Sequence, residues 1–234
     1  MSLTHCTAAI IDLDGTLVDT LNDFVVAINL MLLDVGYREV ERAVVALRIG
    51  KGSENLVNSV LNHALAELNR AQAAPKNIVK IDHALALYQH HYRAVNGQNA
   101  AVYPGVVAGL EALQTAGVKM ACLTNKPVVF ARELLKLKGL DAYFSQVFGG
   151  DSFEEKKPHP LPVIKSCAAL STLPPQTLMV GDSSNDAEAA RAAGCPVVLV
   201  TYGYNHGLPI ASAGADSIIG SLVELAPLLG LNKR

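Results

Sequence analysis

Several features that define large classes of proteins are scarce or missing in this chain. Its 234 residues include no tryptophan and four cysteines, which are scattered without a C-x-x-C pair or zinc-ligand spacing. No apolar run approaches the roughly 20 residues that span a bilayer. No basic segment followed by an apolar stretch marks a secretory signal at the N-terminus. We therefore expect a protein of the reducing cytoplasm that has no structural disulfides and does not associate with membranes.

The chain also has no marked excess of positive or of negative charge. The chain carries 19 basic and 21 acidic side chains, and it has no basic stripe with interleaved aromatic residues. It therefore has no electrostatic basis for binding nucleic acid. Half of its residues are hydrophobic, which is enough for a sizeable core and argues against disorder. The length allows one large domain or two modest ones.

Residues 21–96 show helical patterns and no convincing strand. Apolar residues recur at helical spacing from Leu21 to Val35, from Leu56 to Leu68, and from about Ile78 to Arg93. The Pro- and Ala-containing segment 71–75 between the second and third of these patterns is predicted to be a loop. This part of the chain is therefore expected to be all-helical.

From residue 98 onward, strand and helix patterns alternate. Apolar strand patterns occur at 118–123, 146–148, 177–180, 197–200 and 217–219. Such alternation predicts a parallel sheet that is covered by helices on both faces. Segment 1–18 contains a further apolar run and supplies one strand of the same sheet. We therefore predict an α/β protein in which a helical block, 19–97, is inserted into a sheet domain formed by 1–18 and 98–234.

The most informative segment lies at the end of the first predicted strand. Its apolar run ends in Asp12 and Asp14, which Gly15 follows. The two carboxylates share one face of a regular strand, and Gly15 indicates a turn at the strand end, where open α/β sheets bind ligands. Crowded carboxylates repel each other unless they share a cation, which suggests a Mg²⁺ site. The alternative is an ordinary polar turn, since Asp and Gly are common turn residues.

Three further polar clusters follow later strands of the predicted sheet. Thr124 and Asn125 precede a helix, where they are expected either to bind a phosphate or to cap the helix. Lys157 stands in a proline-containing loop, either as a fixed positive charge or as a solvated surface lysine. Asp182 and Asp186 flank a strand-to-helix junction, as ligands of Mg²⁺ or as helix caps.

Taken together and in this order, the four clusters resemble the motifs of the haloacid dehalogenase superfamily. Further segments are similar to its phosphoglycolate phosphatase branch: Ile49–Gly52, Thr124–Pro127, Lys156–Pro160, Gly194–Pro196 and Thr201–Gly207. The resemblance implies a Rossmann-like core with an inserted all-helical cap domain. It also implies Mg²⁺-dependent hydrolysis of 2-phosphoglycolate to glycolate and phosphate through an aspartyl phosphate. The chain departs from the branch at Lys51, where Asn is frequent, and at His206, where Tyr is frequent.

The resemblance also implies catalytic roles for individual residues. Asp12 matches the nucleophile, and Asp14 matches the general acid and base. Thr124 and Lys157 match the hydroxyl and the lysine that bind the phosphate, and we expect Asn125 to bind the substrate beside them. An acidic residue at position 14 is missing from the dehalogenases of the superfamily, so cleavage of a carbon–halogen bond is not expected.

The cofactor implied by the resemblance is Mg²⁺. Asp12, Asp14 and Asp182 are the expected metal ligands. Asp186 matches a second acidic position, which we expect just outside the ligand shell or on a bound water.

Substrate choice is expected to lie in the helical block, where Arg48 and Lys51 stand among flexible glycines. These two side chains are predicted to bind a small carboxylate. The alternative is a helix C-terminus with solvated cations. A phosphatase for another small phosphate or for pyrophosphate, or a phosphomutase of the β-phosphoglucomutase type, would share the same core residues. In each case the partner is a small phosphorylated metabolite, and the protein is expected to be a monomer or a homodimer.

Overall fold

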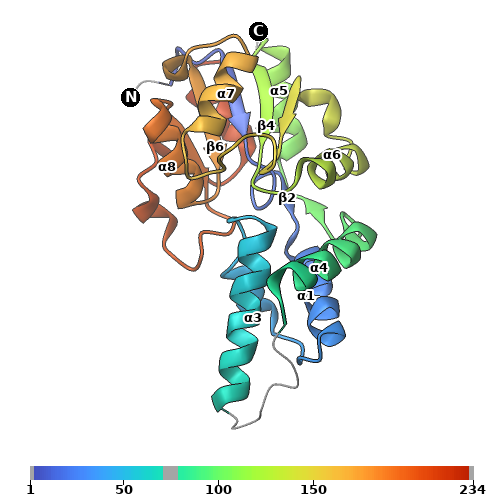
Figure 1. Ribbon diagram of the computed structural model, residues 1–234. Coiled ribbons are helices and arrows are strands. Elements are labelled where there is room, and N and C mark those ends of the chain that lie inside the picture. The colour runs from blue at the N-terminus through green and yellow to red at the C-terminus, as the bar shows by residue number, and fades with distance from the viewer. Residues whose placement is uncertain (1–2, 71–78, 232–234) are drawn as a thin grey trace.

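The computed structural model describes residues 3–70 and 79–231. Its centre is a six-stranded parallel sheet with the strand order β5-β4-β1-β6-β7-β8. These strands are β1 (Ala8–Ile11), β4 (Lys119–Leu123), β5 (Gln146–Phe148), β6 (Thr177–Gly181), β7 (Val197–Val200) and β8 (Ser217–Ile219). β1 therefore lies in the middle of the sheet, between β4 and β6 (Figure 1). The sequence-based prediction of an α/β fold with a Rossmann-like parallel sheet is confirmed.

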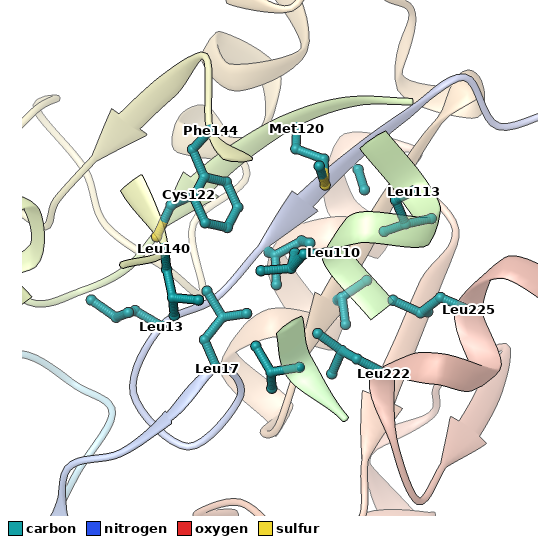
Figure 2. Close-up of a cluster of buried hydrophobic side chains, with 14 of the residues drawn as sticks. Leu13, Leu17, Leu110, Leu113, Met120, Cys122, Leu140, Phe144, Leu222 and Leu225 are labelled. Carbon is teal, nitrogen blue, oxygen red and sulfur yellow. The ribbon is translucent and has the colours of Figure 1, made fainter. Parts of the chain in front are cut away.

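The strands form continuous apolar runs because helices cover both faces of the sheet. One face packs against α5 (Val106–Thr115), α6 (Val128–Leu137) and α9 (Leu225–Leu228). The other face packs against α7 (Leu161–Ala169) and α8 (Ser184–Ala193). Part of the first of these two cores is shown in Figure 2, where Leu110 and Leu113 meet Met120, Leu222 and Leu225.

A helical unit projects from the carboxyl-end edge of the sheet (Figure 1). It contains α1 (Leu21–Asp34), α2 (Arg42–Ala46), α3 (Ser53–Arg70) and α4 (Ile81–Val95). Its buried side chains form a separate hydrophobic cluster, to which the sheet domain contributes Phe130 from α6. Within the described residues, the unit consists of helices that follow the first strand of the sheet, as the sequence predicted. The predicted loop 71–75 and the expected start of a helix at Ile78 lie outside the described residues.

Two short strands join the helical unit to the sheet domain. β2 (Val18–Asp19) pairs antiparallel with β3 (Ala101–Val102), so the outgoing and returning segments lie side by side. The sequence analysis predicted neither this ribbon nor the five-residue helix α2. Strands of two residues are too short to show a period of two, and only the pairing of distant segments reveals them. Short 3₁₀ helices cover Asp141–Tyr143, Pro174–Gln176, Ile210–Ala213 and Leu222–Glu224.

The same junction is held by a buried carboxylate. Asp23, in the first turn of α1, is fully buried and accepts hydrogen bonds from the backbone N–H groups of Gly97 at 2.6 Å and Asn99 at 2.8 Å. Lys138 of the sheet domain donates to the carbonyls of Gly97 and Ala100. The returning segment is therefore fixed from both domains.

Two further observations concern the chain as a whole. No helix of the described residues is long and apolar enough to cross a lipid bilayer. The four cysteines are free and buried. Two of them, Cys167 of α7 and Cys195 after the end of α8, have sulfur atoms 3.7 Å apart.

Replacing Asp23 by alanine tests the junction. We expect Asp23→Ala to lower the free energy of unfolding by about 2–3 kcal/mol, because it leaves two buried N–H groups without an acceptor. Asp34→Ala is the matched control, since the Asp34 carboxylate pairs with His91 at the surface and should matter by less than about 1 kcal/mol. Urea unfolding of both variants measures the difference. Equal midpoints would show that Asp23 does not hold the junction.

Candidate active site

The predicted site residues come together at the carboxyl edge of the sheet. Asp12 and Asp14 follow β1, while Thr124 follows β4 and Asp182 follows β6, the two neighbours of β1. Because parallel strands end at the same edge, these side chains meet although they are far apart in sequence. Together with Lys157 they border a cavity of about 30 Å³ between the sheet and the helical unit.

Lys157 lies between two carboxylates at the centre of this cavity. Its Nζ is 2.7 Å from Asp12 Oδ1 and 2.7 Å from Asp186 Oδ1, and it also donates to the Leu123 carbonyl at 2.8 Å. All three charged side chains are buried. Although burial lowers the pKa of Lys157, the carboxylates of Asp12 and Asp186 raise it further, so the ammonium stays charged.

Burial lowers the pKa of a lysine but raises that of a carboxyl group, as it does for Asp12. Loss of water raises its pKa to about 7, against the lowering effect of the Lys157 ammonium. The pKa of Asp182 is also raised well above its usual range, first by burial and then by the charges of Asp12 and Asp186. The cavity therefore holds more carboxylate charge than one lysine balances.

A second lysine holds Asp14. Lys126 Nζ lies 2.6 Å from Asp14 Oδ1, and the Thr20 hydroxyl donates to the same oxygen at 2.8 Å. The ammonium also lies over the rings of Phe24 and Tyr92, at 4.7 Å and 4.9 Å from their centroids. Lys126 was not among the predicted site residues. The position of Lys126 beside Thr124 and Asn125 is the sequence signal for a place in the site. A lysine at that position is equally compatible with a solvated side chain at the surface.

Glycines allow Asp182 to approach the first motif. A Cβ atom at Gly15, whose φ is +88°, would overlap with the Asp182 carboxylate, and so would one at Gly203. Asp182 Oδ2 in turn accepts the backbone N–H of Tyr204. The positive φ and the close approach both require glycine at position 15.

The acidic cluster fits a hard divalent cation. Asp12, Asp182 and Asp186 each offer one carboxylate oxygen, and these oxygens lie within 4.8 Å of one another. Oxygen donors of this kind suit Mg²⁺, and a cation would offset the excess of buried negative charge. Of the three carboxylates, Asp186 accepts the most hydrogen bonds. Its second oxygen accepts from the Ser183 N–H and from the Ser183 hydroxyl, as in a capping box. Asp14 is not part of this group, and its predicted role as a metal ligand stays a prediction.

The two predicted phosphate-site residues beside Lys126 make contacts within the protein. The Thr124 hydroxyl accepts the Lys126 N–H at 3.2 Å. The Asn125 amide donates to the carbonyls of Lys157 at 2.7 Å and Gly50 at 2.9 Å, and it accepts the Lys157 N–H at 3.0 Å. Asn125 therefore positions the Lys157 loop and links it to the helical unit.

The structure does not bring the side chains of Arg48 and Lys51 to the cavity. Arg48 donates to the Val44 carbonyl at 2.6 Å, in the manner of a residue near a helix C-terminus. Lys51 is exposed, and the residues of this loop that border the cavity are Ile49, Gly50 and Gly52. The contacts from this loop to the sheet domain come from the Gly50 carbonyl, which accepts from Asn125 and Asn185.

Aromatic residues complete the site and were not predicted as part of it. The Tyr204 hydroxyl accepts the N–H groups of Thr20 and Leu21 and donates to Asp19, tying the loop after β7 to the start of α1. Tyr88 and Tyr92 border the cavity from α4. Tyrosines at helical spacing look like ordinary core residues in a sequence, and only the folded chain shows what they face.

Comparisons with known proteins found similar proteins that match nearly the whole of this chain. The family model described as haloacid dehalogenase-like hydrolase matches residues 9–200. The chain is 45% identical to the plasmid-encoded phosphoglycolate phosphatase of Cupriavidus necator, over 96% of this chain and 93% of that protein. It is 40% identical to the phosphoglycolate phosphatase of Thiobacillus denitrificans, with 94% and 93% covered. The crystal structure of a predicted phosphoglycolate phosphatase from Haemophilus somnus superposes with a TM-score of 0.90 at 34% identity, covering 96% of this chain and 98% of that one.

The crowded carboxylates predict a pH-dependent effect of Mg²⁺ on stability. With the pKa of Asp12 at about 7, a proton competes with the cation at pH 6 but not at pH 8. The raised pKa also means that the metal-free protein loses stability as the pH rises from about 4 to 7. Saturating Mg²⁺ should therefore raise Tm by about 5 °C at pH 8 and by less at pH 6.

Thermal unfolding in Mg²⁺ and in EDTA measures this effect. Asp12→Asn should reduce the dependence on pH, and so should Asp182→Asn, because the pKa of each carboxyl group is raised. Asp82→Asn, which changes an exposed residue of α4, should leave it unchanged. A Tm that does not respond to Mg²⁺ at either pH would rule out a cation at this cluster.

Proposed function

Because the chain belongs to the haloacid dehalogenase-like hydrolases, we propose that it is a phosphatase that hydrolyses 2-phosphoglycolate to glycolate and phosphate. The observation that supports this chemistry is that Asp12, Asp14 and Lys157 border the same buried cavity. The choice of substrate rests on the curated phosphoglycolate phosphatases that are similar to this chain over nearly its whole length.

In the first step, a carboxylate oxygen of Asp12 attacks phosphorus in line with the ester oxygen. The P–O ester bond breaks, its electron pair leaves with glycolate, and Asp14 gives its proton to the developing alkoxide. The product of this step is a phosphoryl group bound to Asp12. The position of Asp14 two residues after Asp12 supports this division of roles, since both carboxyl groups border the same cavity.

In the second step, water attacks the aspartyl phosphate and gives its proton to the Asp14 carboxylate. The bond between phosphorus and the Asp12 oxygen breaks, and the electron pair returns to the Asp12 carboxylate. The Lys126 ammonium, 2.6 Å from Asp14 Oδ1, stabilises the ionised form of Asp14 that exists between the two steps.

Positive charge and hydrogen-bond donors offset the charge of the phosphoryl oxygens. Lys157 contributes a fixed ammonium group beside the nucleophile, and the Thr124 hydroxyl lies at the same edge of the cavity. Asp12 and Asp182, with Asp14 or Asp186 nearby, are the residues that would hold Mg²⁺. When bound, the cation supplies Lewis-acid stabilisation of charge on the transferring group.

We propose that residues 19–97 act as a cap domain over a core formed by 1–18 and 98–234. The separate hydrophobic cluster of the helical unit supports this division, as does the short ribbon of β2 and β3 at the two crossings. The cavity lies between the sheet and the helical unit, so movement of the helical unit would change access to it. Opening at the ribbon would admit the substrate, and closure would exclude water from the site.

Phosphate release from a panel of compounds tests the proposed function. We expect kcat/KM for 2-phosphoglycolate to exceed that for pyrophosphate, sugar phosphates and an aryl phosphate by at least about 100-fold, and to be abolished by EDTA. Asp12→Asn should lower kcat by about 10³-fold or more, while the surface variant Asp82→Asn keeps full activity. Preference for another compound would leave the mechanism but overturn the substrate, and isomerisation of a sugar phosphate without phosphate release would indicate a mutase.

A lysine variant tests the role assigned to the second ion pair. Lys126→Met should lower kcat about 10- to 100-fold, because ionised Asp14 loses its partner. Lys136→Met changes an exposed lysine of α6 and serves as the control. If both variants keep the parent kcat and circular dichroism confirms that both are folded, Lys126 has no part in proton transfer.

A further inference from the structure

Two residues that border the cavity carry buried hydroxyl groups with no hydrogen-bond partner among the described residues. They belong to Tyr88 and Tyr92 of α4, each of which is 1% exposed. The Ser53 side chain lies close enough to the Tyr88 phenol to lower its pKa in part, but it forms no hydrogen bond of acceptable geometry with it. A buried hydroxyl without a partner destabilises the fold, because it has exchanged its bond with water for none.

Packing does not account for these hydroxyl groups. The two rings stack on each other with centroids 5.5 Å apart. The ring of Tyr92 also contacts Phe24 at 5.3 Å and Phe130 at 5.2 Å. Phenylalanine would make the same ring contacts without burying a polar atom. The described part of the chain supplies neither hydroxyl group with a partner, which leaves both available to a ligand in the cavity that the two residues border.

The cavity is bordered by neutral hydrogen-bond donors from α4 and by paired charges from the sheet edge. Its two lysines are already engaged, Lys126 with Asp14 and Lys157 with Asp12 and Asp186. Burial raises the pKa of both phenols well above the usual range, and Asp14 raises it further. Both tyrosines therefore remain protonated donors within electrostatic reach of Asp14.

The N-terminus of α3 borders the same part of the cavity. This helix begins at Ser53, and Gly52, Ser53 and Leu56 are among the residues that line the space. The first N–H groups of an α-helix have no acceptor within the helix and carry partial positive charge. An anion placed there would meet backbone donors as well as the two phenols.

We propose that Tyr88, Tyr92 and the N-terminus of α3 bind the carboxylate of the leaving group and thereby determine specificity for a carboxylate-bearing phosphate ester. This inference rests on the proposed function and extends it to the part of the substrate that is not transferred. In 2-phosphoglycolate, one methylene group and the ester oxygen separate the carboxylate carbon from phosphorus. A substrate with its phosphate at Asp12 therefore places its carboxylate within the same small cavity. This assignment differs from the prediction for Arg48 and Lys51, which do not border the cavity.

The test compares 2-phosphoglycolate with ethyl phosphate, which has nearly the same length and no carboxylate. Tyr88→Phe and Tyr92→Phe should each lower kcat/KM for 2-phosphoglycolate about 10-fold, mainly through KM, and should change that for ethyl phosphate by less than about 2-fold. Tyr37→Phe is the matched control, because Tyr37 packs on the helical unit away from the cavity. The unliganded Tyr88 and Tyr92 variants should unfold at the parent Tm or above it.

Calorimetric titration provides a readout that does not depend on turnover. In an Asp12→Asn background with Mg²⁺, either tyrosine variant should weaken binding of 2-phosphoglycolate about 10-fold and leave binding of ethyl phosphate unchanged. Arg48→Ala and Lys51→Ala are measured alongside. If these two variants weaken 2-phosphoglycolate binding and the tyrosine variants do not, the carboxylate site lies at the loop and the tyrosine proposal is overturned.

The remaining outcomes separate this proposal from the proposed function. If the parent prefers 2-phosphoglycolate and the tyrosine variants keep that preference, the proposed function stands and only the tyrosine proposal fails. Equal losses on both substrates would show that the hydroxyl groups position Asp14, which also overturns it. If the parent hydrolyses 2-phosphoglycolate no faster than ethyl phosphate, the proposed function fails and the carboxylate site fails with it.

Discussion

The ammonium group of Lys157, buried between Asp12 and Asp186, is the interaction on which the rest of the site depends. Its three partners come from β1, from the end of β4 and from α8, so one side chain fixes three elements of the sheet edge. Removing one member of a buried ion pair commonly costs about 3–5 kcal/mol, because the other charge is left without a partner. The geometry of the Asp12 carboxylate and the packing of this edge are therefore set by the same contact.

The balance of charge explains why the site favours both an anion and a cation. Two lysines pair with three carboxylates, whereas the Asp182 carboxylate accepts from the backbone N–H of Tyr204 and has a strongly raised pKa. Under the proposed function, a divalent cation would relieve this excess of negative charge, and a bound phosphoryl group would then meet both the cation and Lys157. Glycines at the turn after β1 and after β7 permit the close approach that creates the excess.

The helical unit supplies what the sheet edge lacks. It covers the charged residues with aromatic rings and small backbone segments, and it joins the sheet domain through the Gly50 carbonyl and the buried carboxylate of Asp23. A phosphoryl site alone cannot distinguish one phosphate ester from another, because the transferred group is common to all of them. Under the proposed function, selectivity for the leaving group arises at the part of the cavity that α3 and α4 border. The hydroxyl groups of Tyr88 and Tyr92 are the hydrogen-bond donors there.

The sequence predicts the sheet strands and the inserted helical block, because buried strands have long apolar runs. The sequence also predicts the convergence of Asp12, Thr124, Lys157 and Asp182, because parallel strands end at one edge. It did not reveal the two-residue ribbon, the partner of Asp14 or the faces of the tyrosines. These depend on contacts between residues far apart in the chain: Lys126 meets Asp14 across 112 positions. A lysine in a loop and a tyrosine in an amphipathic helix have the same local pattern whether they face solvent, core or ligand. Only the tertiary structure decides among these, because burial and partnership are properties of the folded chain.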